Sequence, residues 1–131
     1  MAKVFLGGTV NNSQWREELI PKLKVDFFNP VVEDWTDEAY KKELAARESC
    51  DFCLYVLTPK ISSFYSIAEA IDDSNKRPKK TIFCFLLDDA GQKFSDFQIK
   101  SMKAIGKMVK ENGGQWLNSI DEIAVYLNSK S

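Results

Sequence analysis

The sequence contains no histidine and only three cysteines among its 131 residues. Without histidine, a Ser-His-Asp mechanism is excluded. Cys50 and Cys53 form a CxxC pair, but a structural zinc site would lack its remaining ligands because there is neither a second pair nor a histidine. The odd cysteine count also argues against a complete disulfide framework. We therefore expect Cys50 and Cys53 to be free, buried thiols that behave as small apolar side chains, and we expect neither a metal nor a cofactor.

The chain also lacks an excess of charge and any long apolar run. Its 18 basic and 19 acidic residues give a net charge of −1, whereas nucleic-acid binding usually accompanies a clear basic excess. No apolar run approaches the length of a membrane span, and the N-terminus lacks the apolar centre of a signal peptide. We expect a single cytoplasmic domain over residues 1–131, with neither nucleic acid nor membrane as a partner.

What the sequence does contain is a regular alternation of two kinds of segment. The expected strands are residues 4–7, 25–28, 52–57, 81–87 and 115–117. The expected helices are residues 14–23, 36–48, 62–75 and 96–111, with a last helix opened by Ser119 and Glu122. Residues 52–57 are almost continuously apolar, as in a central strand covered on both faces. The alternation predicts an α/β fold with one doubly wound, mainly parallel five-stranded sheet, helices on both faces and right-handed crossovers.

This topology brings four loops to one edge of the sheet, where open α/β folds bind their ligands. They are residues 8–12, 29–35, 58–63 and 88–92. Their side chains are hydroxyls, amides and carboxylates, with one aromatic ring: Thr9, Asn11, Asn29, Asp34, Trp35, Thr58, Ser62, Ser63 and Asp88. Such groups suit a sugar and a flat heterocycle better than an apolar ligand.

Familiar motifs are missing from these loops. The first loop, GGTVNNS, does not fit the G-x-G-x-x-G dinucleotide pattern, and the chain has neither a P-loop nor a G-x-S-x-G elbow. A flavodoxin-like flavin site is compatible with the topology, although Gly7-Gly8-Thr9 is a weak phosphate cradle. The chemistry that remains is that of carboxylates, which needs a nucleophile and an acid rather than a histidine.

Glu69 and Glu43 are the carboxylates that we expect to act together. Glu69 lies in the first turns of the helix after the third strand. Glu43 lies in the preceding helix on a stripe with Ala39, Ala46 and Cys50. These small apolar neighbours would raise the pKa of Glu43 and keep it protonated as an acid.

Each carboxylate also has a structural interpretation. Ser66-x-x-Glu69 fits a capping box, and Glu69 shares a helix side with Tyr65 and Asp72, as on a solvated face. Glu43 could pair with a surface lysine such as Lys42. Both interpretations stay open at the level of the sequence.

Three segments resemble the nucleoside 2-deoxyribosyltransferase family, and more closely its divergent nucleoside 2-deoxyribosyltransferase-like branch. They are VFLGGT, FFNPVVEDW and ESCDFCLYVLTPKISSFYSIAEAIDDSNKRPKKTIFCF, and the resemblance spans roughly residues 3–110. It implies a doubly wound fold and cleavage of the N-glycosidic bond of 2'-deoxynucleosides or their monophosphates. The deoxyribosyl group would pass to another nucleobase, as in nucleotide salvage.

The resemblance also implies roles for particular residues. Glu69 matches the nucleophile, which would form a covalent glycosyl-glutamate intermediate, and Glu43 matches the acid that assists the departing base. Ser63 matches a position that is aspartate in many transferases and serine in related nucleotide hydrolases. Hydrolysis is therefore an alternative to transfer, and a non-catalytic nucleotide-binding module is a third reading.

The expected substrate-binding residues lie in the edge loops. Trp35 would stack on the base, with a buried structural tryptophan as the alternative, and Asn29 and Asp34 would hydrogen-bond the edge of the base. The remaining positions are Gly7, Gly8, Thr9 and Ser63. The partners would be a small nucleoside or nucleotide and a free nucleobase, and relatives imply a homo-oligomer. The chain departs from the family pattern at Phe5, often a tyrosine in relatives, and at Tyr65 and Ile67, where many relatives have glycines.

Overall fold

A computed structural model describes residues 1–131. The strands are β1 (Lys3–Gly8), β2 (Asp26–Phe28), β3 (Phe52–Leu57), β4 (Thr81–Phe85), β5 (Asp88–Asp89), β6 (Gln92–Lys93) and β7 (Gln115–Leu117). The α-helices are α1 (Trp15–Leu19), α2 (Asp37–Ser49), α3 (Tyr65–Lys76), α4 (Asp96–Glu111) and α5 (Ile120–Asn128). Two short 3-10 helices, η1 (Ile20–Lys22) and η2 (Pro78–Lys80), follow α1 and α3.

Five of the strands form one parallel sheet in the order β2-β1-β3-β4-β7. Strand β2 lies on one side of β1, whereas β3, β4 and β7 follow one another on the other side. The direction in which strands are added to the sheet therefore reverses at β1. The sequence-based prediction of a doubly wound α/β sheet is confirmed. The change of direction falls between β1 and β3, and the cleft at the carboxyl ends of these two strands is where such folds bind ligands.

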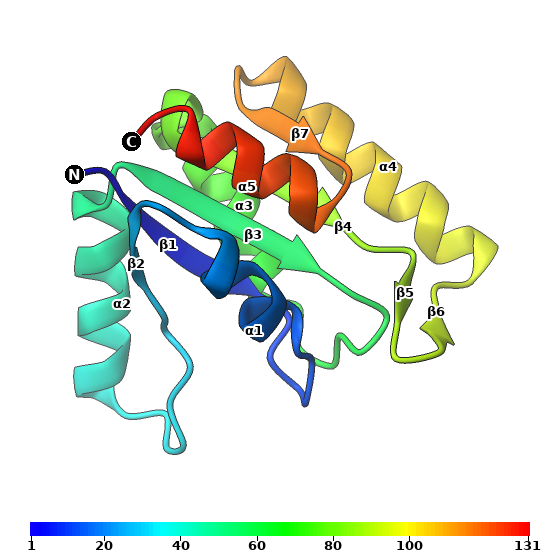
Figure 1. Ribbon diagram of the computed structural model, residues 1–131. Coiled ribbons are helices and arrows are strands. Elements are labelled where there is room, and N and C mark those ends of the chain that lie inside the picture. The colour runs from blue at the N-terminus through cyan, green and yellow to red at the C-terminus, as the bar shows by residue number, and fades with distance from the viewer.

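Helices cover both faces of the sheet (Figure 1). Alternate strand residues point to opposite faces, so β1 gives Val4 and Leu6 to one core and Phe5 to the other. Helices α1 and α5 pack on the first face, and α2, α3 and α4 pack on the second. The two helices that carry Glu43 and Glu69 therefore lie on the same side of the sheet.

Several boundaries differ from the sequence-based expectation for local reasons. The helix expected over residues 14–23 ends at Leu19 and continues as η1, since Pro21 cannot donate a backbone hydrogen bond. Helix α3 begins at Tyr65, three residues later than expected, and β4 ends at Phe85. The loop expected over residues 88–92 instead lies within a small β5–β6 hairpin, whose turn places Ala90 and Gly91 at φ of 51° and 87°.

The three cysteines are all free and buried, which confirms the expectation for Cys50 and Cys53. The structure has no cluster of three or more side chains of the metal-ligating types. None of its helices combines the length and the apolar character needed to cross a lipid bilayer.

Gly8 permits the close approach of β1 and β3 at the ligand-binding edge. Its φ is +122°, a region that side chains rarely adopt, and a Cβ there would lie 2.0 Å from the backbone oxygen of Val56. The next residue, Thr9, then donates its backbone N–H to the same Val56 oxygen at 2.9 Å. Gly8 therefore fixes where the chain leaves the sheet.

We predict that Gly8→Ala lowers the free energy of unfolding by about 2 kcal/mol or more, because it combines a disfavoured φ with a backbone clash. Gly91→Ala is the matched control, since Gly91 also has a positive φ but no atom within 4 Å of its hypothetical Cβ. It should cost only about 1 kcal/mol. Urea unfolding of both variants measures the difference, and equal losses would contradict the role of the clash.

Candidate active site

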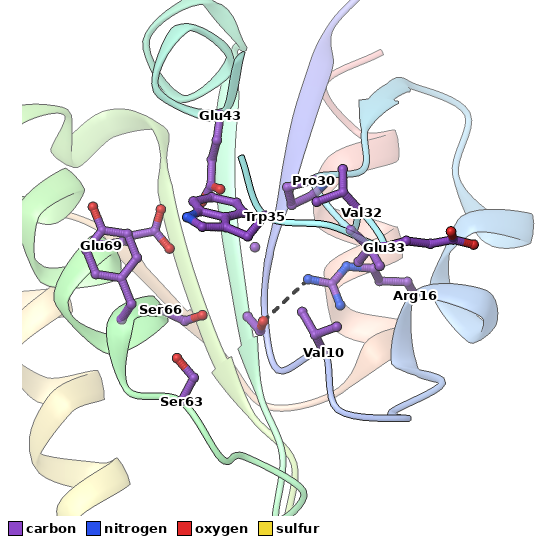
Figure 2. A pocket seen from close by; sticks show the side chains of 14 residues that line it. Val10, Arg16, Pro30, Val32, Glu33, Trp35, Glu43, Ser63, Ser66 and Glu69 are labelled. Atoms are coloured by element: carbon purple, nitrogen blue, oxygen red, sulfur yellow. Dashed lines mark hydrogen bonds between the residues drawn. The ribbon is translucent and has the colours of Figure 1, made fainter. Parts of the chain in front are cut away.

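A cavity of about 420 Å³ opens at the carboxyl ends of β1 and β3. Its walls come from the end of β1, the β2–α2 loop, helix α2 and the first turns of α3. Figure 2 shows Glu69, Ser63 and Ser66 on one side of the cavity, Arg16 on the other, and Glu43 reaching in from α2. Of the sequence-predicted site residues, this cavity brings together Gly7, Gly8, Trp35, Glu43, Ser63 and Glu69.

Glu69 lies at the inner end of this cavity and not on a solvated helix face. The N-cap of α3 is Phe64, with no side-chain capping bond, so Ser66 lies inside the helix and the capping-box interpretation is wrong. Only 5% of Glu69 is exposed, whereas the side chain of Asp72, three residues later, is 42% exposed. One carboxylate oxygen, Oε2, is buried without a hydrogen-bond partner. An unpartnered buried oxygen facing a cavity is available to a ligand.

Glu43 is brought to the same place by the preceding helix. Thr36 caps α2 by accepting a hydrogen bond from the backbone N–H of Ala39 at 3.1 Å. Two turns further on, Glu43 is buried, so the surface-lysine interpretation is also wrong. The two acidic side chains thus meet in one desolvated space although 26 residues separate them in the sequence.

The pair has unusual acid–base properties. The pKa of Glu69 is raised from its ordinary 4.5 to about 9, chiefly by burial and then by hydrogen bonding to Glu43 and by the negative charge of Glu43. Two close carboxyl groups that share a site cannot both ionise readily, so at neutral pH the pair retains a proton. One protonated and one ionised carboxyl is the state needed by a site with one acid and one nucleophile.

Arg47 connects this pair to a buried ion-pair network. Its Nη1 lies 3.5 Å from Oε2 of Glu69. Its Nε and Nη2 donate to the two carboxylate oxygens of Asp73, each at 3.1 Å. Asp73 is fully buried and also accepts hydrogen bonds from the Tyr55 hydroxyl and from Arg77. The positive charge of Arg47 opposes the rise in the pKa of Glu69.

The sequence did contain a signal for this network that our sequence analysis missed. Arg47 follows Glu43 by four residues on α2, and Asp73 follows Glu69 by four residues on α3. Residues four apart lie on the same helix face. The two acids and the Arg47–Asp73 pair are therefore neighbouring rows of one helix–helix contact.

The opposite wall carries a second buried cation, Arg16, which the sequence analysis also missed. Its guanidinium donates to the backbone oxygens of Leu6, at 2.9 and 3.0 Å, and of Thr9, at 2.8 Å. It makes no ion pair with a carboxylate, and burial lowers the pKa of Arg16 to about 10. Arg16 therefore braces the loop after β1 and leaves a cationic edge on the cavity (Figure 2).

Three predicted substrate-binding residues lie outside the main cavity. Thr9 is buried, and its hydroxyl accepts a hydrogen bond from the backbone N–H of Thr58 at 3.0 Å, which ties the first and third loops together. Asn29 and Asp34 line a smaller adjoining pocket of about 200 Å³, which shares Glu43 with the main cavity.

Trp35 lies at the mouth of the cavity and is 57% exposed, so it is not a buried core residue. Its ring packs edge-on against Tyr40 at 5.9 Å between centroids. Tyr65 also lines the cavity, and its hydroxyl lies 3.5 Å from that of Tyr40. Among the other departures from the family pattern, Phe5 is buried, and Ile67 packs at the edge of the second core.

The chain was compared with known proteins. A family model described as "Nucleoside 2-deoxyribosyltransferase like" matches residues 1–86 of the 131. The chain therefore belongs to the nucleoside 2-deoxyribosyltransferase-like family, as its resemblance predicted. The matched region contains Glu43, Glu69 and every element that lines the cavity. Searches of the curated proteins and of the solved structures found no match. Family membership supports a transferase-like function on small nucleoside or nucleobase substrates.

The buried acid should make the stability of the fold depend on pH. The folded-state pKa of Glu69 is above its unfolded value, so its contribution is fully present below about pH 4.5 and is lost as the pH rises towards 9. Glu69→Gln stays neutral throughout and should be more stable than the wild type, by on the order of 2 kcal/mol at pH 7. Glu48→Gln, a change at an exposed site on α2, should have no such effect. Urea unfolding between pH 4 and 9 tests this, and a pH-independent difference would contradict it.

Proposed function

We propose that this protein cleaves the N-glycosidic bond of 2'-deoxynucleosides and transfers the deoxyribosyl group to another nucleobase. The observation that carries the proposal is the buried Glu43–Glu69 pair, with one Glu69 oxygen free of hydrogen bonds and facing the cavity. A cavity of about 420 Å³ is within the usual range for a small-molecule site. Two carboxyl groups supply the nucleophile and the acid that glycosyl transfer needs, and neither a metal nor histidine is required.

The first half of the reaction begins with the proton held by the pair. Transfer of this proton from Glu69 to Glu43 gives an ionised nucleophile beside a protonated acid. An oxygen of Glu69 then bonds to the anomeric carbon of the sugar through an oxocarbenium-like transition state. The bond between that carbon and the base breaks, its electron pair goes to the base, and Glu43 delivers its proton to the departing base.

The second half reverses these roles. An acceptor base attacks the anomeric carbon from the opposite face, and the electron pair of the ester bond returns to Glu69. Glu43, now ionised, accepts the proton that the acceptor loses. Two displacements retain the configuration of the sugar, as in retaining glycosidases. Water in place of the acceptor base gives hydrolysis.

The remaining cavity residues are proposed to hold the substrate. Trp35 presents an exposed ring at the mouth and stacks on the base. Gly7 and Gly8 let the substrate approach the backbone, and the Ser63 hydroxyl donates to an oxygen of the sugar or its 5'-substituent. Asn29 and Asp34, in the adjoining pocket, contact the edge of the base, whereas Thr9 supports the loop that forms this wall.

Incubation with a series of deoxynucleosides and deoxynucleoside monophosphates, with and without a free acceptor base, tests the reaction class. A new nucleoside that forms only when acceptor is present supports transfer. Free base released without acceptor indicates that hydrolysis is the main reaction. Binding of nucleotides without any product from any of them would contradict the enzymatic proposal and favour a nucleotide-binding module.

The nucleophile has its own test. We predict that Glu69→Ala abolishes turnover and that Glu69→Gln nearly does so, because neither side chain can form a glycosyl ester. In the wild type, an acid-quenched reaction should contain protein whose mass has increased by one deoxyribosyl group, carried by a peptide that includes Glu69. Wild-type rates in either variant would refute the assignment.

The acid can be distinguished from the nucleophile by the leaving group. Glu43→Gln should lower turnover of ordinary deoxynucleosides by about 10²–10⁴-fold, the usual contribution of general acid catalysis. The loss should be much smaller with a 7-methylated purine deoxynucleoside, whose base departs without protonation. An equal loss with both substrates would show that Glu43 is not the acid.

We also propose that the protein is a homo-oligomer. The resemblance implies a second subunit beside the site, and bulky apolar side chains are exposed around it, including Phe64 at 73%. Light scattering should give a mass at least twice the 14.9 kDa of one chain. A monomer at micromolar concentration would contradict this.

A further inference from the structure

We propose that Arg47 is a positioning residue for Glu69: Asp73, itself held by Tyr55, fixes the guanidinium so that its free Nη1 edge faces the Glu69 carboxyl group and orients it towards the cavity. This inference rests on the proposed function only for its catalytic meaning. The geometry itself is independent of any substrate.

The guanidinium of Arg47 uses most of its donors on two aspartates. Arg47 has five N–H groups in a planar fork. Its Nε–H and one Nη2–H bind Asp73 in a bidentate pair at 3.1 Å, and the other Nη2–H binds Asp72 at 2.9 Å. These three bonds fix the plane of the fork. The only donors left are on Nη1, and Nη1 is the atom that lies 3.5 Å from Oε2 of Glu69.

Asp73, which anchors the guanidinium of Arg47, is itself held in place. Asp73 has no exposed surface. Its two carboxylate oxygens accept hydrogen bonds from Arg47, from the Tyr55 hydroxyl on β3 and from Arg77. Although burial lowers the pKa of Arg47, its hydrogen bonds to Asp73 and the surrounding negative charges raise it above its usual range. Arg47 thus stays charged in a buried position, and the sheet itself limits its movement through Tyr55.

Glu69 needs an opposing positive charge to ionise more easily. Burial and Glu43 both disfavour a charge on Glu69, and the positive charge of Arg47 acts in the opposite direction. The other titratable groups around it are Tyr65 and Asp73 on its own helix, and Glu33 and Arg16 across the cavity. Arg16 is committed to backbone oxygens. Arg47 is the cation that contacts Glu69: its Nη1 lies 3.5 Å from Oε2, which has no hydrogen-bond partner.

The experiment is a carbon-13 NMR titration of protein labelled at the glutamate side-chain carboxyl. The signal of Glu69 is identified by its loss in Glu69→Gln. In Arg47→Met the titration midpoint of Glu69 should rise by about one unit or more, because an opposite charge has been removed. The acidic limb of kcat/KM should move to higher pH by a similar amount. Arg47→Lys, which keeps the charge but not the fork, should restore most of the midpoint and less of kcat.

Arg77→Met is the matched control. Arg77 also binds Asp73 from four residues away on α3, but it forms no ion pair with Glu69. This variant should be less stable than the wild type. Its Glu69 titration midpoint and the acidic limb of its kcat/KM profile should be the same as in the wild type. If Arg47→Met does not fold, Arg47→Gln takes its place, since the amide can still donate to Asp73 without carrying a charge.

The outcomes separate this inference from the proposed function. An unchanged Glu69 midpoint in a folded Arg47→Met or Arg47→Gln variant would overturn the positioning role, whether or not the enzyme is active. A raised midpoint in a protein that turns over no deoxynucleoside would support the positioning of Glu69 and refute the proposed reaction.

Discussion

The site depends on the burial of two carboxyl groups against each other. Glu43 and Glu69 are both at least nine-tenths buried, and the fold bears the energetic cost of holding acids where water cannot solvate their charges. The Arg47–Asp73 pair beside them offsets part of this cost, and the helices α2 and α3 are held in register by the same contacts. Stability and reactivity are therefore set by one cluster of side chains rather than by separate regions.

The sheet explains why this cluster faces a cavity. The strand order changes direction between β1 and β3, and the cavity lies at the carboxyl ends of these two strands. Helices α2 and α3 both pack on the same face of the sheet as Phe5 and Tyr55. Their buried acids, Glu43 and Glu69, line the cavity. The backbone at Gly8, which only glycine tolerates there, fixes where the loop that forms the other wall leaves the sheet.

The sequence predicted those parts whose signals are local. The strand expected over residues 52–57 and the helix expected over residues 96–111 have the same boundaries as β3 and α4 in the structure. The two-residue strands of the β5–β6 hairpin are too short to show any periodicity, so they were missed. The start of α3 was placed too early because three serines near it all resemble caps, whereas Phe64 takes the cap position without a side-chain bond. The Arg47–Asp73 pair was missed because the four-residue spacings from Glu43 and Glu69 indicate it only once the two helices are known to face each other.

The Arg47–Asp73 pair also has an evolutionary consequence. Buried ion pairs can often be replaced by well-packed apolar side chains with no loss, or with a gain, of stability. Selection for stability alone would therefore accept apolar residues in place of Arg47 and Asp73, and the cation beside Glu69 would then be lost.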